Sequence, residues 1–419
     1  AIDDRLMKQR EEGLEVVGFR KRWLITKFGQ FQIKRRLYRN REGESRYLLD
    51  EAIGLTRWSP LSSGVKELSI LLASYLPFGK SERVLEMVVP AGVSHTTIHR
   101  QLSKIADLSL TEEEKELTEV YEQGKVPEPG KRRVPMLFVE GDGVSIALQR
   151  EEKRRTELKV GIAYEGWEKI GSQDRYRLKE KTAYMSLADG GHFWEGFSLE
   201  LARKYDLAGI GRVVVGGDGA GWVKEGADIL GGCYQLDRFH LRRALLRTLK
   251  SDVAAANEVY QACITGNVAL ADTLLRSRQL KSSPETAVEI RQVRNYIINN
   301  MEGLVDYRRR LENTDVTGLR GMGAMEANVD KLAANRMKKR GMSWTKKGIR
   351  RMARILQLQQ QGKICSWPTE KTTRTPFIKS PNKPAAAIDT KNAHYATWLD
   401  HNLPALSGPH SNRPWARAL

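Results

Sequence analysis

The chain has 419 residues, of which 70 are lysine or arginine and 51 are aspartate or glutamate, so its formal net charge is +19. This length allows two or three domains, and the excess of positive charge favours a polyanionic partner. No run approaches the ~18 consecutive apolar residues of a membrane span, and the N-terminus has no apolar signal core, so the sequence predicts neither membrane insertion nor secretion. Three widely spaced cysteines fit neither a disulfide framework nor a cysteine-based zinc site, and they indicate a reducing, cytoplasmic compartment. The chain begins with Ala1 rather than methionine, as expected of a fragment or a processed form.

Residues 1–60 predict a small, basic module that contains β-structure. Apolar runs at 23–26 and 31–33 flank the sequence Phe-Gly-Gln at 28–30, which favours a hairpin. A basic hairpin suits phosphate binding and equally suits a solvated surface. The basic residues that surround it are Arg20, Lys21, Arg22, Lys34, Arg35 and Arg36.

Residues 61–123 predict a helical DNA-binding domain of the helix-turn-helix type. Apolar residues from Val65 to Tyr75 share one helical face, and Ser94 is placed to cap a later helix after the break at 90–92. Two short helices joined by a glycine-containing turn are typical of this motif, although any three-helix bundle has the same pattern. The residues predicted to contact base edges or phosphates are Ser94, Thr96, Thr97 and Arg100.

A Pro/Gly-rich linker at 124–133 marks the first domain boundary. Residues 131–240 predict a mixed α/β sheet, because adjacent strand-like runs are followed by alternating helix and strand. The periodicity of 241–320 is helical throughout, which predicts an α-helical insertion. Residues 321–361 predict a return to the core with basic helices, and 362–419 predict an extended or disordered tail. The predicted strands are 134–149, 159–164, 182–187, 212–216 and 233–236.

Acidic residues follow the apolar runs of two of these predicted strands. The apolar run 136–139 leads into the sequence Glu-Gly-Asp that ends with Asp142, and the valines at 213–215 lead into a glycine-rich turn containing Asp218. Because open α/β sheets keep their chemistry at strand ends, we interpret Asp142 and Asp218 as a carboxylate pair. The alternative is that an aspartate between glycines serves only the turn.

A carboxylate pair of this kind predicts a third acid, since two Mg²⁺ ions in phosphoryl transfer are held by several hard oxygen ligands. Glu326 fits, because it follows a glycine cluster and begins a strongly basic helix. Glu302 and Glu312 are rivals on spacing alone. A further alternative is that Glu326 is an acid favoured by the dipole at a helix start.

Two other groups of polar residues accompany the acids. Asp237 and His240 form a D-x-x-H group after the last predicted strand, or alternatively His240 only bonds to Asp237 at a helix start. In the segment 331–354, ten of 24 residues are basic and none is acidic. We expect this segment to contact the phosphates of a nucleic acid. The residues concerned are Lys338, Lys339, Arg340, Lys346, Lys347, Arg350 and Arg351.

Five segments make the sequence recognisable. The chain resembles bacterial insertion-sequence transposases of the DDE type, specifically the ISLre-two family, also filed as an uncharacterised protein family. The resemblance spans nearly the whole chain, and the last three segments together are highly specific. The segments are LLDEAIGL at 48–55, VEGDG at 139–143, GDGAGW at 217–222, LDRFHLRRAL at 236–245 and GAMEANVDKLAANRMKKRGMSW at 323–344.

The resemblance implies an RNase H-like core that an α-helical insertion interrupts before the final glutamate. It implies that the acid triad is Asp142, Asp218 and Glu326, holding two Mg²⁺ ions for which Mn²⁺ can substitute. Related Mutator and hAT-type transposases carry a C/D-x-x-H group after the second aspartate, which Asp237 and His240 match. We expect that pair to position the DNA strand or support the site from outside the metals. The missing methionine start and the unstructured C-terminus depart from a full-length element protein.

The expected function is therefore that of a DDE transposase. It would bind the terminal inverted repeats of its own element, cleave DNA with Mg²⁺ and join 3′-hydroxyl ends to target DNA. Because two DNA ends must be synapsed, we expect a homo-oligomer on DNA, associated with the bacterial nucleoid and with no membrane partner. The alternatives are a domesticated, non-catalytic DNA-binding protein and an RNase H-like nuclease without strand transfer.

Overall fold

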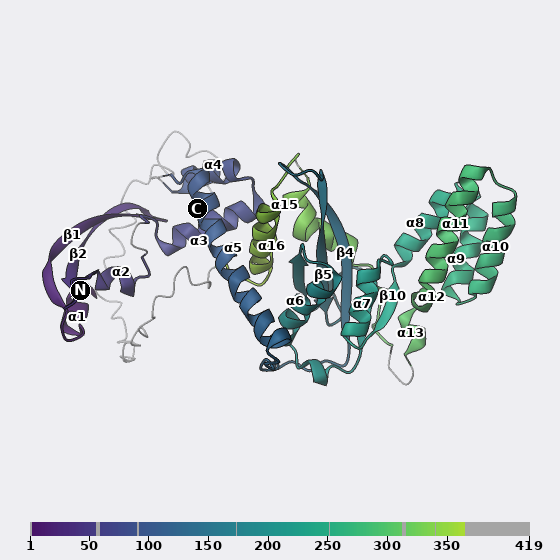
Figure 1. The fold of residues 1–419 in the computed structure, drawn as a ribbon, viewed down its shortest axis with the longest axis horizontal. Helices are drawn as coiled ribbons and strands as arrows, with labels where there is room; N and C mark the ends of the chain where they lie inside the picture. The colour runs from purple at the N-terminus through teal and green to yellow at the C-terminus, as the bar shows by residue number, and fades with distance from the viewer. Residues whose placement is uncertain are drawn as a thin grey trace. The chain divides into compact units, whose positions relative to one another are not determined.

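Figure 1 shows the computed structural model of the chain. The predicted contact residue Arg340, the rival acid Glu312 and residues 365–419 of the predicted tail lie outside the described residues. Within the described part of the chain, no helix is both long and apolar enough to cross a bilayer. The described residues belong to the first of two units, Ala1–Glu370. They are 2–55, 59–89, 92–172, 174–250, 252–311, 316–339 and 341–364.

The N-terminal residues form a three-stranded antiparallel sheet in the order β1-β2-β3. Its hairpin is much longer than the apolar runs predicted, because the ladder continues through charged pairs such as Arg20 opposite Arg35. Asp50 accepts hydrogen bonds from Arg22 at 2.6 Å and from Arg35 at 2.8 Å, so these two basic residues fasten a short helix to the hairpin. The elements are α1 (Ile2–Lys8), β1 (Glu15–Thr26), β2 (Gly29–Arg39), β3 (Ser45–Arg46) and α2 (Leu48–Ala52).

Three helices follow, as the sequence predicts: α3 (Ser63–Tyr75), α4 (Phe78–Val88) and α5 (His95–Leu117). Ser94 caps α5 by accepting the backbone N–H of Thr97 at 3.4 Å. α5 is longer than a recognition helix requires and continues into the π-helical turn η1 (Thr118–Glu122). Its added length packs against the last helix of the chain, α16 (Lys346–Gln360).

The central element is a mixed five-stranded sheet, which confirms the predicted α/β class. The strand order is β10-β9-β4-β5-β8, with β5 antiparallel to β4 and β8, and with β9 and β10 parallel to β4. β6 (Trp167–Lys169) and β7 (Tyr176–Leu178) form a separate hairpin. The sheet strands are β4 (Leu137–Ala147), β5 (Arg155–Tyr164), β8 (Thr182–Ser186), β9 (Val213–Gly217) and β10 (Cys233–Leu236).

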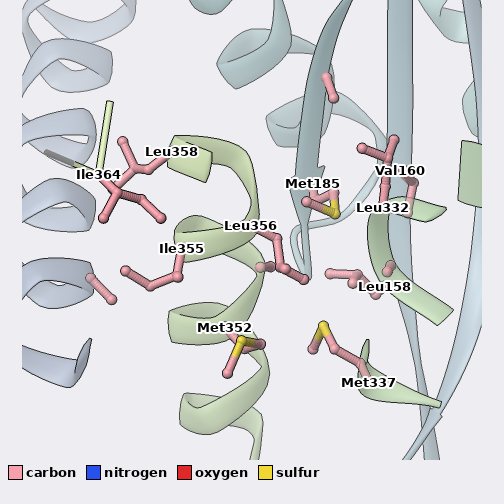
Figure 2. Packing of buried hydrophobic residues seen from close by; sticks show 14 of the residues in the cluster. Leu158, Val160, Met185, Leu332, Met337, Met352, Ile355, Leu356, Leu358 and Ile364 are labelled. Carbon is pink, nitrogen blue, oxygen red and sulfur yellow. The ribbon is translucent and has the colours of Figure 1, made fainter. Parts of the chain in front are cut away.

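Helices cover both faces of this sheet. On one face, α6 (Gly190–Ala202) and α7 (Gly221–Ile229) bury Phe193, Trp194 and Val223; η2 (Leu207–Gly209) lies between them in the chain. On the other face, Leu332, Met337, Met352 and Leu356 pack with Leu158 and Val160 of β5 (Figure 2). These side chains come from α16 and from a continuous helical stretch of α14 (Met325–Val329), the π-helical η3 (Asp330–Ala334) and α15 (Asn335–Met337).

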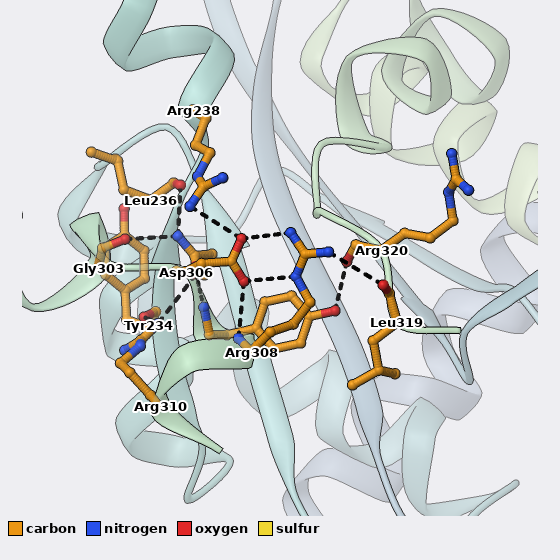
Figure 3. Close-up of polar contacts among 11 residues, drawn as sticks. Tyr234, Leu236, Arg238, Gly303, Asp306, Arg308, Arg310, Leu319 and Arg320 are labelled. Atoms are coloured by element: carbon orange, nitrogen blue, oxygen red, sulfur yellow. Dashed lines mark hydrogen bonds and ion pairs between the residues drawn. The ribbon is translucent and has the colours of Figure 1, made fainter. Parts of the chain in front are cut away.

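Between β10 and α14, the described residues form helices and no strand. Both ends of this helical lobe are tied to β10. Gln235 donates to the Gly303 carbonyl at 2.8 Å and accepts the Tyr307 N–H at 2.7 Å. Asp306 pairs with Arg238 at 3.1 Å and with Arg308 at 2.8 Å (Figure 3). The lobe contains α8 (Arg238–Leu249), α9 (Val253–Ile264), α10 (Val268–Leu280), α11 (Pro284–Asn299), α12 (Met301–Leu304) and α13 (Tyr307–Arg310).

Candidate active site

Strand register brings three aspartates to one level of the sheet. In the parallel ladder, Gly217 is the partner of both Gly141 on β4 and Leu236 on β10. The next residue on each strand path is an aspartate: Asp142, Asp218 and Asp237. Neighbouring strands lie about 4.8 Å apart, so the three residues form a row across β4, β9 and β10, which we call the acidic row.

Asp142 points to the face that α14 covers. A Cβ placed on its neighbour Gly141 would meet Trp222 and Val223 of α7 on the opposite face, and side chains alternate along a strand. Burial raises the pKa of Asp142 to about 6, and the negative charges of Asp218 and Asp237 also act to raise that pKa. The hydrogen bond from the Gly143 N–H at 2.7 Å and the nearby His240 lower it.

The remaining predicted site residues, Glu326 and His240, both influence the pKa of Asp237. Burial is the main cause that raises it, and the charges of Glu326 and Asp218 also raise it. The Phe239 N–H, which donates to Asp237 at 2.8 Å, and His240 lower it. The site therefore gathers the predicted triad and the D-x-x-H group within one electrostatic environment.

Glu326 lies on α14, which packs against β4 and β5 of the sheet. Its neighbour Met325 is buried in the core, whereas Glu326 itself is exposed on the next position of the helix. The rival Glu302 lies on α12, where it pairs with Lys224 of α7 at 3.9 Å. The charge of Glu326 raises the pKa of Asp237, which lies at one end of the acidic row.

Glu140 is a buried glutamate that sequence reasoning did not select. It lies two residues before Asp142 on β4, on the same face, and only 2% of it is exposed. Its carboxylate accepts the Tyr164 hydroxyl at 2.6 Å and the N–H groups of Gly323 and Met325, each at 3.1 Å. A fourth donor, the Ala324 N–H, lies at 3.3 Å.

These bonds anchor the start of α14, and therefore Glu326, to the strand that carries Asp142. Burial raises the pKa of Glu140, while the bonds from Tyr164 and the backbone lower it. An ionised carboxylate best accepts four donors, because it has only acceptor sites. The sequence signal was an acid inside an otherwise apolar strand run.

The donor types of the row suit a hard divalent cation, since carboxylate oxygens are the ligands that Mg²⁺ and Mn²⁺ prefer. Within the described residues, no three His, Cys, Asp or Glu side chains are arranged to hold a metal ion. The raised pKa of Asp142 reflects buried, mutually repelling carboxylates, which a bound cation would stabilise. Asp142, Asp218 and Glu326 thus offer the kind of oxygen donor that such an ion takes, and Glu326 is the most exposed of the three.

Asp237 and His240 already have local roles. Asp237 caps α8 through the Phe239 N–H, and His240 Nε2 lies 3.8 Å from Asp237 Oδ2. The backbone N–H of Asp237 donates to the Gly217 carbonyl at 2.8 Å, which ties the end of β10 to β9. These contacts suit a pair that holds the start of α8 against the acidic row.

The predicted DNA-contacting residues of α5 lie at its start. Ser94, Thr96 and Arg100 are exposed, and Thr97 is half-buried. Arg100 donates to the Thr97 hydroxyl at 3.4 Å, so this end of the helix presents hydroxyl groups beside a guanidinium. This is a suitable surface for phosphate or base-edge contacts.

The basic residues of the segment 331–354 differ in whether they form ion pairs with acidic residues. Lys339 pairs with Asp330 at 2.6 Å, and Lys346 pairs with Glu151 at 3.3 Å. Lys338 and Lys347 are exposed without an ion pair among the described residues.

Arg350 and Arg351 of the segment are joined to α5. Arg350 pairs with Glu114 at 3.2 Å, and Arg351 forms a two-pronged pair with Asp107, with one contact at 2.7 Å. Arg351 therefore fastens α16 to α5. Their acidic partners were not visible in a count of charges along 331–354.

The first prediction concerns stability without metal. Folding raises the pKa of Asp142 from 3.8 to about 6, so the folded chain binds more protons between these values, and stability falls as pH rises through that window. In EDTA at pH 7.5, the free energy of unfolding of Asp142→Asn should exceed that of the wild type by about 1–2 kcal/mol, after allowance for partial exposure. The variant should therefore unfold at a higher guanidinium concentration. Near pH 4 the two proteins should unfold alike. A less stable variant at pH 7.5 would contradict this electrostatic account.

Comparison with known proteins gives consistent matches along the chain. The model of an uncharacterised protein family, UPF0236, matches residues 1–368. UPF0236 protein TTE0610/TTE0881/TTE1053/TTE2432 of Caldanaerobacter subterraneus subsp. tengcongensis is 25% identical over 370 residues, 86% of this chain and 72% of the relative. A second relative from that organism, whose name joins eleven such labels, is 24% identical over 365 residues, 86% of this chain and 72% of the relative. The UPF0236 protein in the vanSb 3′ region of Streptococcus gallolyticus is 26% identical over 359 residues, 84% of this chain and 75% of the relative.

Proposed function

The chain belongs to the uncharacterised protein family UPF0236, and from this premise and the acidic row we propose that it is a DDE transposase of the ISLre-two type. It would bind the terminal inverted repeats of its insertion sequence, cleave DNA in a metal-dependent reaction and transfer the 3′-hydroxyl ends to target DNA. The observation that carries the proposal is the level register of Asp142 and Asp218 in the parallel ladder, with the charge of Glu326 acting on their neighbour Asp237. Because two ends must be joined in one event, the active form would be a homo-oligomer on DNA.

The arrangement of the sheet supports this proposal. Three antiparallel strands followed by two parallel ones, in the order β8-β5-β4-β9-β10, are what an RNase H-like core would have. The helical lobe begins directly after β10 and ends before α14, so it interrupts the sequence of the core without interrupting the sheet. The third acid of the proposed triad, Glu326, then lies on α14, the helix that follows the lobe.

The residues of the site would have different roles in phosphodiester exchange. Bound Mg²⁺ or Mn²⁺ would supply Lewis-acid activation of the attacking oxygen and stabilisation of the leaving oxygen. Asp142, Asp218 and Glu326 would hold that metal centre. Glu140 fixes the helix of Glu326, and Asp237 with His240 fixes the start of α8. Exchange of one phosphodiester bond for another requires no nucleotide energy source.

The names of the relatives also favour a protein encoded by a mobile genetic element. One name joins eleven labels of a single organism, and another joins four. We interpret joined labels as several copies of one sequence in a genome, which is the pattern expected of a mobile element. A domesticated DNA-binding protein would be expected as a single copy.

The test is a cleavage and joining assay. The purified chain is incubated with labelled oligonucleotides that carry the ends of its element and with a supercoiled target plasmid, in Mg²⁺ or in EDTA. We expect end cleavage and plasmid joining in Mg²⁺ only, and neither with scrambled ends. Cleavage without joining would indicate a nuclease. Binding of the ends without cleavage would indicate a DNA-binding protein that is not catalytic.

The second prediction concerns the basic segment. Replacing the exposed Lys338, Lys346 and Lys347 by glutamine should weaken binding to all DNA alike, because phosphate contacts carry no sequence information. The slope of log affinity against log salt should become shallower by about 0.9 for each phosphate that the variant no longer neutralises. Fluorescence anisotropy with cognate and scrambled duplexes over a salt series measures both effects. Weaker binding confined to the cognate duplex would make the segment a sequence reader instead.

A further inference from the structure

α8 presents a face of exposed apolar and basic side chains, one of which, Arg242, has its guanidinium 5.9 Å from the centre of the Tyr260 ring on α9. Phe239 is 49% exposed and Leu246 is 37% exposed, whereas Leu241 and Leu245 on the opposite side are buried. Helical spacing places the exposed residues on one face. A shallow, open depression of about 420 Å³ lies along this face. We call it the α8 stripe, and its residues are Phe239, Arg242, Arg243, Leu246 and Arg247.

The arginines of the α8 stripe differ from those of α16 in their pairing. Among the described residues, Arg242, Arg243 and Arg247 have no acidic partner within ion-pair distance, whereas Arg350 and Arg351 are both paired. Instead, the Arg243 guanidinium lies 6.0 Å from the centre of the Phe239 ring. Three exposed positive charges on the same helix face as an exposed aromatic ring form a surface that complements a polyanion with accessible bases.

The stripe begins at the acidic row. Asp237 caps α8, and the rings of Phe239 and His240 lie 5.6 Å apart in an edge-to-face arrangement. From Phe239 to Arg247 the helix rises about 12 Å at ~1.5 Å per residue. A DNA strand advances about 3.4 Å per nucleotide, so the stripe matches three to four nucleotides.

We propose that the α8 stripe binds the single DNA strand next to the phosphate that reacts at the acidic row, with Phe239 stacked on an unpaired base and the arginines on the phosphates. The assignment of the adjoining phosphate rests on the proposed function, and the surface itself rests on the exposed residues. A duplex would offer Phe239 no base face except at its end, so the stripe selects unpaired nucleotides. The arginines also offset the repulsion that the acidic row exerts on a strand.

The test compares two DNA probes in EDTA, so that binding is measured without cleavage. One is a fluorescein-labelled blunt duplex, and the other is the same duplex with an eight-nucleotide dT overhang. The wild-type chain should bind the overhang probe more tightly than the blunt probe. Phe239→Leu should reduce that advantage by about 5–100-fold, the range expected for one stacked base, with blunt-probe affinity unchanged. Phe239→Tyr, which keeps an aromatic ring, should preserve the advantage of the overhang probe.

The arginines are tested in the same assay. Arg242→Gln, Arg243→Gln and Arg247→Gln combined should weaken overhang binding and flatten its salt dependence. Tyr121→Leu, an aromatic of similar exposure at 46%, and Arg276→Gln, whose side chain pairs with Asp272 at 2.7 Å, serve as matched controls and should change neither probe. Circular dichroism melting of each variant checks that α8 still folds.

The outcomes separate this inference from the proposed function. Equal affinity of Phe239→Leu and the wild-type chain for the overhang probe overturns the inference, whatever the cleavage assay gives. An equal decrease on both probes also overturns it, because the stripe would then be a general cationic surface. A decrease on the overhang probe alone supports it even if the chain joins no DNA, in which case only the proposed transposase activity fails.

Discussion

Replacing Glu326 by glutamine is expected to abolish both hydrolysis and strand transfer in Mg²⁺, with binding of the element ends retained and a rate decrease of about a thousandfold or more. Glutamine keeps the size of the side chain but removes one charged, hard oxygen ligand from the proposed metal centre. The fold should persist, because Glu326 is exposed and its neighbour Met325 makes the core contact. Single-turnover cleavage of labelled ends, with anisotropy for binding, measures the two effects separately.

Glu302→Gln provides the matched control for this result. Glu302 lies on α12 and contacts Lys224 on the surface at 3.9 Å, so its replacement should leave cleavage within about twofold of wild type. Glu312→Gln should likewise stay active. If the Glu326 variant cleaved at a near wild-type rate, or if one of the other two were inactive, the assignment of the third acid would be wrong.

The second large effect is expected at Glu140. Glutamine at this position keeps one acceptor oxygen but turns an amide N–H₂ toward the backbone N–H groups of Gly323 and Met325. Because the site is buried, we expect Glu140→Gln to lower the free energy of unfolding by about 2–4 kcal/mol. The start of α14 should loosen, and kcat for cleavage should fall while the affinity for DNA in EDTA stays constant. Guanidinium denaturation and single-turnover kinetics measure these changes.

Tyr164→Phe separates positioning from stability in this network. It removes one of the four donors to Glu140 and leaves the three backbone bonds that hold α14. It should lower stability by about 1–2 kcal/mol but change cleavage little, measured at a temperature where all variants are folded. If the cleavage rates of Glu140→Gln and Tyr164→Phe fell in proportion to their stability alone, Glu140 would not position Glu326.

The two aspartates could be selected from the sequence because their signals are local. A run of valines followed by glycines marks the end of β9, and the acid after it, Asp218, is visible without any tertiary information. The strand-end position predicted for Asp142 is wrong, because β4 continues to Ala147 by pairing with β5, so that Asp142 lies within the strand. Their relation to each other was not visible, because register between β4 and β9 depends on pairing of segments that are far apart in the chain. Only that register puts Asp142 and Asp218 level, with Asp237 beside them on β10.

Glu140 and the arginines of α16 show the limits of reading charges along a chain. Glu140 was visible as an acid in an apolar run, but its role was not, because three of its partners are backbone N–H groups of residues 323–325, which carry no sequence signature. Arg350 and Arg351 looked like a free basic surface because their partners, Glu114 and Asp107, lie on α5. Charge density therefore predicted a nucleic-acid surface, whereas pairing decides which of its residues are available.

The N-terminal hairpin shows the same limit for secondary structure. Apolar alternation revealed only its tip, while the ladder continues through charged residues such as Lys21 opposite Lys34. Like charges directly opposite are unfavourable by themselves, so the pairing relies on contacts such as those of Asp50 with Arg22 and Arg35. Such long-range compensation is absent from local patterns.

The central claim is that Asp142, Asp218 and Glu326 together hold the metal ions of a phosphoryl-transfer site. The most direct measurement is the structure of the chain bound to element-end DNA in Mn²⁺, with the anomalous signal locating the ions. We expect two Mn²⁺ ions about 4 Å apart at the acidic row, bound by carboxylate oxygens of these three residues, with Asp237 and His240 off the metals. Anomalous density elsewhere, or ions at the row held without Glu326, would contradict the claim.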